Sequence, residues 1–221
     1  MNRRPALLSA AAMAAAAVLS LSACGGSGGD SKSSDKIAGA DDGAQASASP
    51  SSKTTDDGID RPEIKLPKGV EDAFEGSKTT GDPKKDAVLA DNARRISSVT
   101  EAVTVDAKEH PALKFYSSGD ALLSAANHVQ GFQKKNKSFV GTTRYYDREV
   151  TFLKDGAAAV TYCMDATKTY PKDRETGKVD KSIPASAQDY SFYNTRLEKN
   201  ADGVWQTTAV LTTTAAKRCM P

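Results

Sequence analysis

Residues Tyr190–Thr214 read YSFYNTRLEKNADGVWQTTAVLTTT, two runs rich in aromatic, Val and Thr residues on either side of Asn200-Ala201-Asp202-Gly203. Aromatic and β-branched residues favour strands, whereas Asn, Asp and Gly favour tight turns, so this stretch predicts a β-hairpin. A second hairpin is predicted upstream, because Arg148–Leu153 alternates polar and apolar residues, Lys154-Asp155-Gly156 turns the chain, and Ala157–Asp165 continues as a strand. The C-terminal half of the chain therefore predicts an antiparallel sheet.

Two further segments lie beside these hairpins. Phe139–Tyr146 contains enough aromatic and apolar residues to add another edge strand. Pro171–Gln188 is polar, contains two prolines and carries charges of both signs, so it is expected to form an exposed excursion between the hairpins.

Helices are predicted upstream of the sheet. Asp82-Pro83 provides a capping carboxylate followed by a proline, and a helix is expected from there to about Ala107. A short helix is expected over Pro111–Tyr116, and a further apolar stripe begins at Ala121. The first helix has an apolar face of Leu89, Ala93, Ile96, Val99 or Thr100, and Val103, and an opposite face of Asp91, Arg94, Arg95 and Glu101. One-sided helices are stable only when packed against another layer, so the order of elements predicts an α+β domain over residues 81–221.

The N-terminal residues predict export and a lipid anchor. Arg3 and Arg4 precede Ala6–Leu21, which is almost wholly apolar or small, as in a signal peptide. Leu21-Ser22-Ala23-Cys24 resembles a bacterial lipobox, which implies cleavage after residue 23 and acylation of Cys24. We therefore expect a signal peptide over residues 1–23 and a chain held at the extracytoplasmic face of the cell membrane. The alternative is an ordinary signal peptide with an incidental cysteine.

Residues 24–80 predict a disordered tether. They consist mainly of Gly, Ser, Ala, Asp, Lys and Thr, too little apolar surface to offset the entropy of ordering. Ile64, Leu66, Val70 and Phe74 leave open whether residues 64–74 dock on the domain as an extended arm. Mixed charges here and a net charge of +2 for the whole chain argue against a nucleic-acid partner.

Two cysteines remain after Cys24. An even pair in an oxidising compartment predicts a disulfide between Cys163 and Cys219, contributing about 4 kcal/mol through its long loop. The alternative is a reactive or metal-binding thiol. Metal binding would need further soft ligands, but the sequence offers only His110 and His128 and no Cys-x-x-Cys spacing, so no metal or cofactor is expected.

The order of elements resembles the nuclear transport factor 2-like fold. The resemblance rests on Asp155-Gly156-Ala157 with Val160-Thr161-Tyr162-Cys163, and on Asp202-Gly203-Val204-Trp205 leading to Cys219. More narrowly, the chain resembles actinobacterial secreted lipoproteins of that superfamily. The resemblance implies N-terminal helices packed on a curved antiparallel sheet, a cone with a pocket between the two layers.

The pocket implied by the resemblance gives three functional hypotheses. The candidates for its lining are Tyr116, His128, Tyr145, Tyr162 and Trp205. The first hypothesis is a module that binds an apolar small ligand or an envelope protein. The second is a small cofactor-free isomerase or dehydratase, whose candidate proton carriers are His128, Asp147, Asp165, Tyr145, Tyr146 and Tyr162. The sequence contains no nucleophile elbow, Walker loop or dinucleotide motif, so no catalytic residue is assigned. The third is a purely structural envelope component without a cavity. A homodimer through the outer sheet face stays open.

Overall fold

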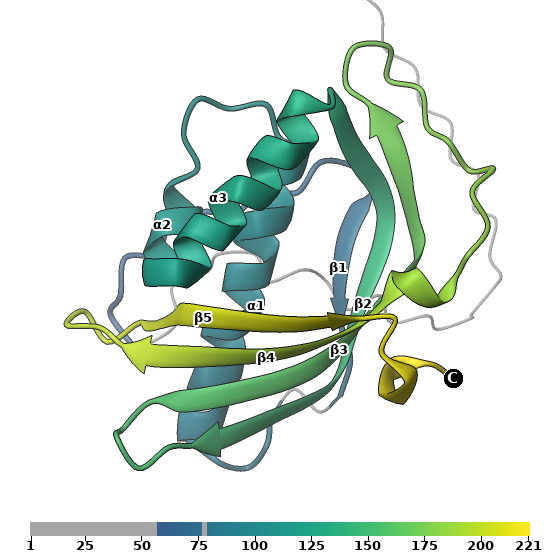
Figure 1. Cartoon of the computed structure of the whole chain (residues 1–221). Coiled ribbons are helices and arrows are strands. Elements are labelled where there is room, and N and C mark those ends of the chain that lie inside the picture. The colour runs from purple at the N-terminus through teal and green to yellow at the C-terminus, as the bar shows by residue number, and fades with distance from the viewer. Residues whose placement is uncertain (1–56, 77–78) are drawn as a thin grey trace, which may run out of the picture. The chain divides into compact units, whose positions relative to one another are not determined.

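The computed structural model describes residues 57–76 and 79–221, and the predictions for the signal peptide, Cys24 and residues 24–56 lie outside this range. The α+β class is confirmed: the helices lie on the concave side of a curved five-stranded sheet with the order β1-β2-β3-β4-β5 (Figure 1). The elements are β1 (Val70–Phe74), α1 (Pro83–Thr104), α2 (Pro111–Tyr116), α3 (Gly119–Lys134), β2 (Lys137–Phe152), β3 (Ala158–Asp173), β4 (Tyr190–Lys199) and β5 (Trp205–Thr214), with short 3-10 turns η1 (Ala187–Asp189) and η2 (Lys217–Cys219).

Helix α1 begins as its cap predicts but is buried more completely than its pattern indicates. The Asp82 carboxylate accepts a hydrogen bond from the Lys84 backbone N–H at 2.9 Å, and Pro83 occupies the first turn. However, Asp91 and Arg95, placed opposite the apolar face, are only 2% and 7% exposed. They are buried because α1 packs against α2 and α3 as well as against the sheet.

The sheet begins before residue 81, where the domain boundary was expected. Strand β1 pairs in parallel with β2, from Val70 opposite Gly141 to Phe74 opposite Tyr145. Upstream, Ile59 and Ile64 pack against a buried cluster formed by Ala112, Tyr116 and Val204. The prediction of disorder is therefore wrong for residues 57–76, here called the arm, and residues 64–74, whose docking the sequence left open, are part of it.

Strand β2 includes Phe139–Tyr146, which is not a separate edge strand. It continues as the same strand past register shifts after Thr142 and after Tyr146, where Asp147 adopts a φ of 50°. Gly141 has a φ of 112°, a conformation that L side chains rarely adopt. Irregularities of this kind bend a strand and increase its twist, which is how β2 curves around the helices.

The disulfide between Cys163 and Cys219 is confirmed, with Cα atoms 5.4 Å apart. The two cysteines do not lie on neighbouring strands. Cys163 lies on β3 and Cys219 in η2, and β4 separates β3 from β5. After β5 the chain turns at Ala215, which has a φ of 54°, and the Ala216 N–H donates to the Tyr190 carbonyl. The C-terminal segment thus crosses back over β4 to reach β3.

Candidate functional site

A cavity of about 240 Å³ lies between the helices and the sheet. Its wall is mainly aliphatic and aromatic, and side chains from α1, α3, β2, β3 and β4 form it. The lining residues are Arg95, Ile96, Val99, Thr100, Val103, His128, Phe132, Phe139, Thr143, Tyr145, Tyr162, Met164, Ala166, Thr169 and Tyr193. A wider hollow of about 540 Å³, here called the mouth, shares His128, Phe132, Phe139, Ala166 and Thr169 with the cavity.

Three tyrosines form the polar part of the sheet-side wall. The rings of Tyr162 and Tyr193 stack with centroids 4.9 Å apart, and Tyr145 meets Tyr162 edge-on at 6.0 Å. Burial raises the pKa of all three phenols above the usual tyrosine value. The hydroxyls therefore stay protonated, and that of Tyr193 donates to Met164 Sδ at 3.8 Å. Two of the predicted lining residues, Tyr145 and Tyr162, thus lie at the centre of this wall.

Arg95 contributes a positive charge from α1 to the same cavity. Its side chain lines the wall, the residue is 7% exposed, and its Nε has no hydrogen-bond partner. Within residues 57–76 and 79–221, no carboxylate lies within 4.0 Å of this guanidinium. The sequence analysis missed Arg95 as a site residue, because the apolar periodicity of α1 places it opposite the apolar face.

His128 lies where the cavity meets the mouth. The residue is largely exposed, and its ring meets Phe132 edge-on at 5.2 Å. Desolvation of the imidazole against this wall lowers the pKa of His128, and the nearby charge of Arg95 lowers it further. The imidazole is therefore neutral at pH 7, and Arg95 is the principal cation of the lining.

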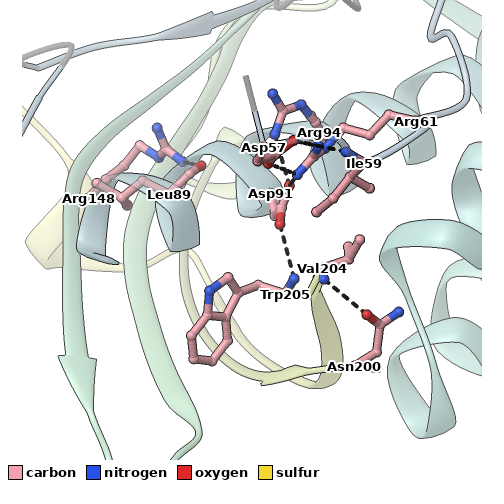
Figure 2. Close-up of polar contacts among 10 residues, drawn as sticks. All are labelled: Asp57, Ile59, Arg61, Leu89, Asp91, Arg94, Arg148, Asn200, Val204 and Trp205. Atoms are coloured by element: carbon pink, nitrogen blue, oxygen red, sulfur yellow. Dashed lines mark hydrogen bonds and ion pairs between the residues drawn. The ribbon is translucent and has the colours of Figure 1, made fainter. Parts of the chain in front are cut away.

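Tyr116 and Trp205, the other two predicted lining residues, lie outside the cavity. Tyr116 is fully buried beneath the arm, and this burial raises its pKa to about 12. Trp205 belongs to the main core, and its backbone N–H donates to Asp91 Oδ2 at 3.0 Å (Figure 2). Asp91 also pairs with Arg94 at 2.8 Å and with Arg61 of the arm at 3.5 Å. These contacts fasten the arm, α1 and β5 together, which is a structural role.

Asp72 is a buried carboxylate close to the cavity that the sequence analysis missed. It is 1% exposed, its Oδ1 accepts from Thr100 Oγ1 at 3.1 Å, and its Oδ2 has no hydrogen-bond partner. Burial raises its pKa to about 6, although the hydrogen bond from Thr100 favours the ionised form. Since Thr100 lines the cavity, Asp72 lies one side chain behind the wall.

The remaining proton-carrier candidates lie away from the cavity. Asp165 pairs with Arg144 at 2.9 Å, and Asp147 is exposed at the bulge of β2. The Tyr146 hydroxyl donates to the Cys219 carbonyl, beside the disulfide. None of these three residues lines the cavity. The structure therefore separates them from Tyr145, Tyr162 and His128.

Neither a metal cluster nor a membrane span is present in the described part of the chain. Over residues 57–76 and 79–221, no group of three or more His, Cys, Asp or Glu side chains is placed to hold a metal ion. None of the helices in these residues is long and apolar enough to cross a bilayer.

Comparisons with known proteins give similarity at the level of solved structures. No protein-family model matches the chain, and no curated protein matches it. A ketosteroid isomerase-like protein from Erwinia carotovora atroseptica is similar over 61% of this chain and 98% of its own, with 16% identity and a TM-score of 0.43. ActVI-ORFA from Streptomyces coelicolor is similar over 65% of this chain and 100% of its own, with 9% identity and a TM-score of 0.40. The intermembrane space region of the chloroplast protein ARC6 is similar over 58% of this chain and 97% of its own, with 15% identity and a TM-score of 0.38.

Proposed function

We propose that the domain is a binding module that takes a small, largely apolar ligand into the cavity between its helices and its sheet. The observation that carries the proposal is the cavity itself, an aliphatic and aromatic lining with a few convergent polar groups and a mouth at one end. Concave sites of this composition are typical of small-molecule binding. A purely structural component has no need of such a space.

The size of the cavity limits the ligand. At roughly 30 Å³ per water molecule, 240 Å³ corresponds to about eight waters, enough for a ring or a chain of about six carbons. We therefore choose 1-hexanol and benzyl alcohol as neutral probes. Their binding to the full chain is measured by saturation-transfer NMR.

A cavity-filling variant tests the location of binding. Ala166 lies on β3 and lines both the cavity and the mouth. Ala159 lies on the same strand but an odd number of residues away, so it faces the other side of the sheet. Ala166→Phe should abolish binding of both alcohols, whereas Ala159→Phe should retain it. Binding that survives Ala166→Phe in a folded protein would reject the cavity as the site.

A cofactor-free isomerase or dehydratase is the second candidate function. It is favoured by Asp72, a carboxyl group whose pKa of about 6 suits proton transfer near neutral pH, one side chain behind the cavity wall. Exchange of the α-protons of cyclohexanone in D₂O, followed by NMR, tests it. Catalysed exchange that Asp72→Asn eliminates would support an enzyme. Exchange at the buffer rate would leave the binding module as the function.

The cellular part of the proposal concerns Cys24. We infer that acylation of this residue holds the module at the extracytoplasmic face of the cell membrane. The acyl chains insert into the bilayer, and the cavity takes the ligand. The lipobox-like Leu21-Ser22-Ala23-Cys24 supports this. Cys24→Ser should abolish incorporation of labelled palmitate and release the protein from the membrane fraction. Unchanged membrane retention would contradict the anchor.

A further inference from the structure

Arg95 is a buried cation without a charged partner in a cavity that is otherwise mostly apolar. Removing a guanidinium from water costs free energy unless it is paired or fully hydrogen-bonded. The Nε of Arg95 has no hydrogen-bond partner, and no carboxylate of the described residues lies within 4.0 Å of the group. The folded domain therefore holds a buried guanidinium that no described carboxylate contacts directly.

The described side chains that face Arg95 across the cavity are three tyrosines and a histidine. The charge of Arg95 acts on Tyr145, Tyr162, Tyr193 and His128, which places these four groups around it. The three phenols are protonated because burial raises their pKa, and the imidazole is neutral because desolvation and Arg95 lower its pKa. Asp72, a buried carboxyl group behind the same wall, is hydrogen-bonded to Thr100, and it does not lie within 4.0 Å of Arg95.

We propose that the ligand of the cavity is a monoanionic carboxylate with an apolar body, held through its carboxylate by Arg95 and through its body by the aromatic wall. The proposal rests on the function proposed above and adds the ligand class. A guanidinium matches a carboxylate through two parallel hydrogen bonds. A doubly charged phosphate would bring a second negative charge into the cavity that a single arginine leaves uncompensated. The phenols of the wall are protonated and uncharged, so they do not repel the same anion.

Charged and neutral probes of equal length test the inference on the unaltered full chain. Hexanoate, hexanamide, 1-hexanol and hexyl phosphate are titrated by isothermal calorimetry and by NMR. A hydrogen-bonded charge pair in a buried site corresponds to an affinity gain of about 10- to 100-fold, so hexanoate should exceed hexanamide and 1-hexanol by this factor. Hexyl phosphate should bind more weakly than hexanoate.

Equal affinities for hexanoate and 1-hexanol would overturn the ligand class but leave the binding module intact. No binding of any probe would reject the binding module as well.

Variants of Arg95 assign the effect to this residue. Arg95→Gln should reduce the affinity for hexanoate by about 10- to 100-fold and leave that for 1-hexanol within about threefold. Arg95→Lys retains the charge without the planar fork and should be intermediate. Arg196→Gln is the matched control, since Arg196 pairs with Asp155 and Glu198 outside the cavity and should not alter binding. An undiminished preference for hexanoate in folded Arg95→Gln would refute the role of Arg95. If Arg95→Gln does not fold, the comparison of probes on the unaltered chain decides the question.

Discussion

Asp72 makes the stability of the domain depend on pH in a direction opposite to that of most carboxylates. Its pKa rises from an ordinary value of 3.8 to about 6 because burial penalises the charged form. The folded state therefore holds this proton more tightly than the unfolded chain. The stabilisation is complete below about pH 4 and is lost as the pH rises through about 6.

The magnitude follows from the two pKa values. At about 1.4 kcal/mol per pKa unit, ionisation of Asp72 in the folded state costs about 3 kcal/mol at pH 8. Asp72→Asn retains the shape of the side chain and removes the ionisation. Between pH 4 and pH 8, we expect the unfolding free energy of the variant to rise by about 3 kcal/mol relative to that of the unaltered protein.

Urea unfolding at a series of pH values measures this difference, with the fluorescence of the single tryptophan, Trp205, as the probe of the core. Subtracting the unfolding free energies of the two proteins at each pH cancels the contributions of the carboxylates that both contain. Thr100→Val removes a hydrogen bond that favours the ionised form, so it should move the loss of stability to higher pH. A difference between Asp72→Asn and the unaltered protein that is constant from pH 4 to pH 8 would refute the reasoning.

Three further predictions concern the scaffold. Replacing Cys163 and Cys219 by Ala should cost about 4 kcal/mol and lower the thermal midpoint by about 10 °C, because the bridge spans 56 positions of sequence; a calorimetric loss below about 1 kcal/mol would contradict this. Gly141→Ala would place a Cβ 2.0 Å from the Lys168 carbonyl oxygen and should cost more than about 2 kcal/mol in urea unfolding, whereas Gly131→Ala in α3 meets no atom within 4 Å and should gain about 0.5 to 1 kcal/mol. Asp91→Ala should cost about 3 to 5 kcal/mol and expose the arm to limited proteolysis, since it leaves Arg94 and the Trp205 N–H unpaired; an arm that resists protease as before would show that Asp91 does not fasten it.

The elements that the sequence predicts correctly are those whose signals are local. The hairpin of β4 and β5 follows from Asn200-Ala201-Asp202-Gly203, where the Asn200 side chain accepts from the Val204 N–H at 2.9 Å, as Figure 2 shows. The start of α1 follows from Asp82-Pro83 in the same way. In each case the residues that carry the signal make the contacts that stabilise the element.

The features that the sequence analysis missed depend on contacts between distant segments. Strand β1 is five residues long and acquires its hydrogen bonds only from β2, about 70 positions later, so its own composition gives little indication of a strand. Arg95 and Asp72 are of types that usually lie at the surface, and only the packing of α1 and β1 buries them. The fold resemblance implied Tyr145 and Tyr162 as cavity residues, but it implied Tyr116 and Trp205 equally, and these two lie outside the cavity because they pack into the core.

The short parallel strand at the start of the sheet also protects the molecule from its own copies. Strand β1 covers one side of β2 with only five residues, including Glu71, and Glu75 follows directly. Short, charged edge strands of this kind discourage intermolecular strand pairing. A chain shortened to begin at Asp82 would present the unpaired backbone of β2, a strand of 16 residues, to neighbouring molecules. Cleavage ahead of α1 would therefore leave the edge of β2 from Gly141 to Tyr145 without its covering strand.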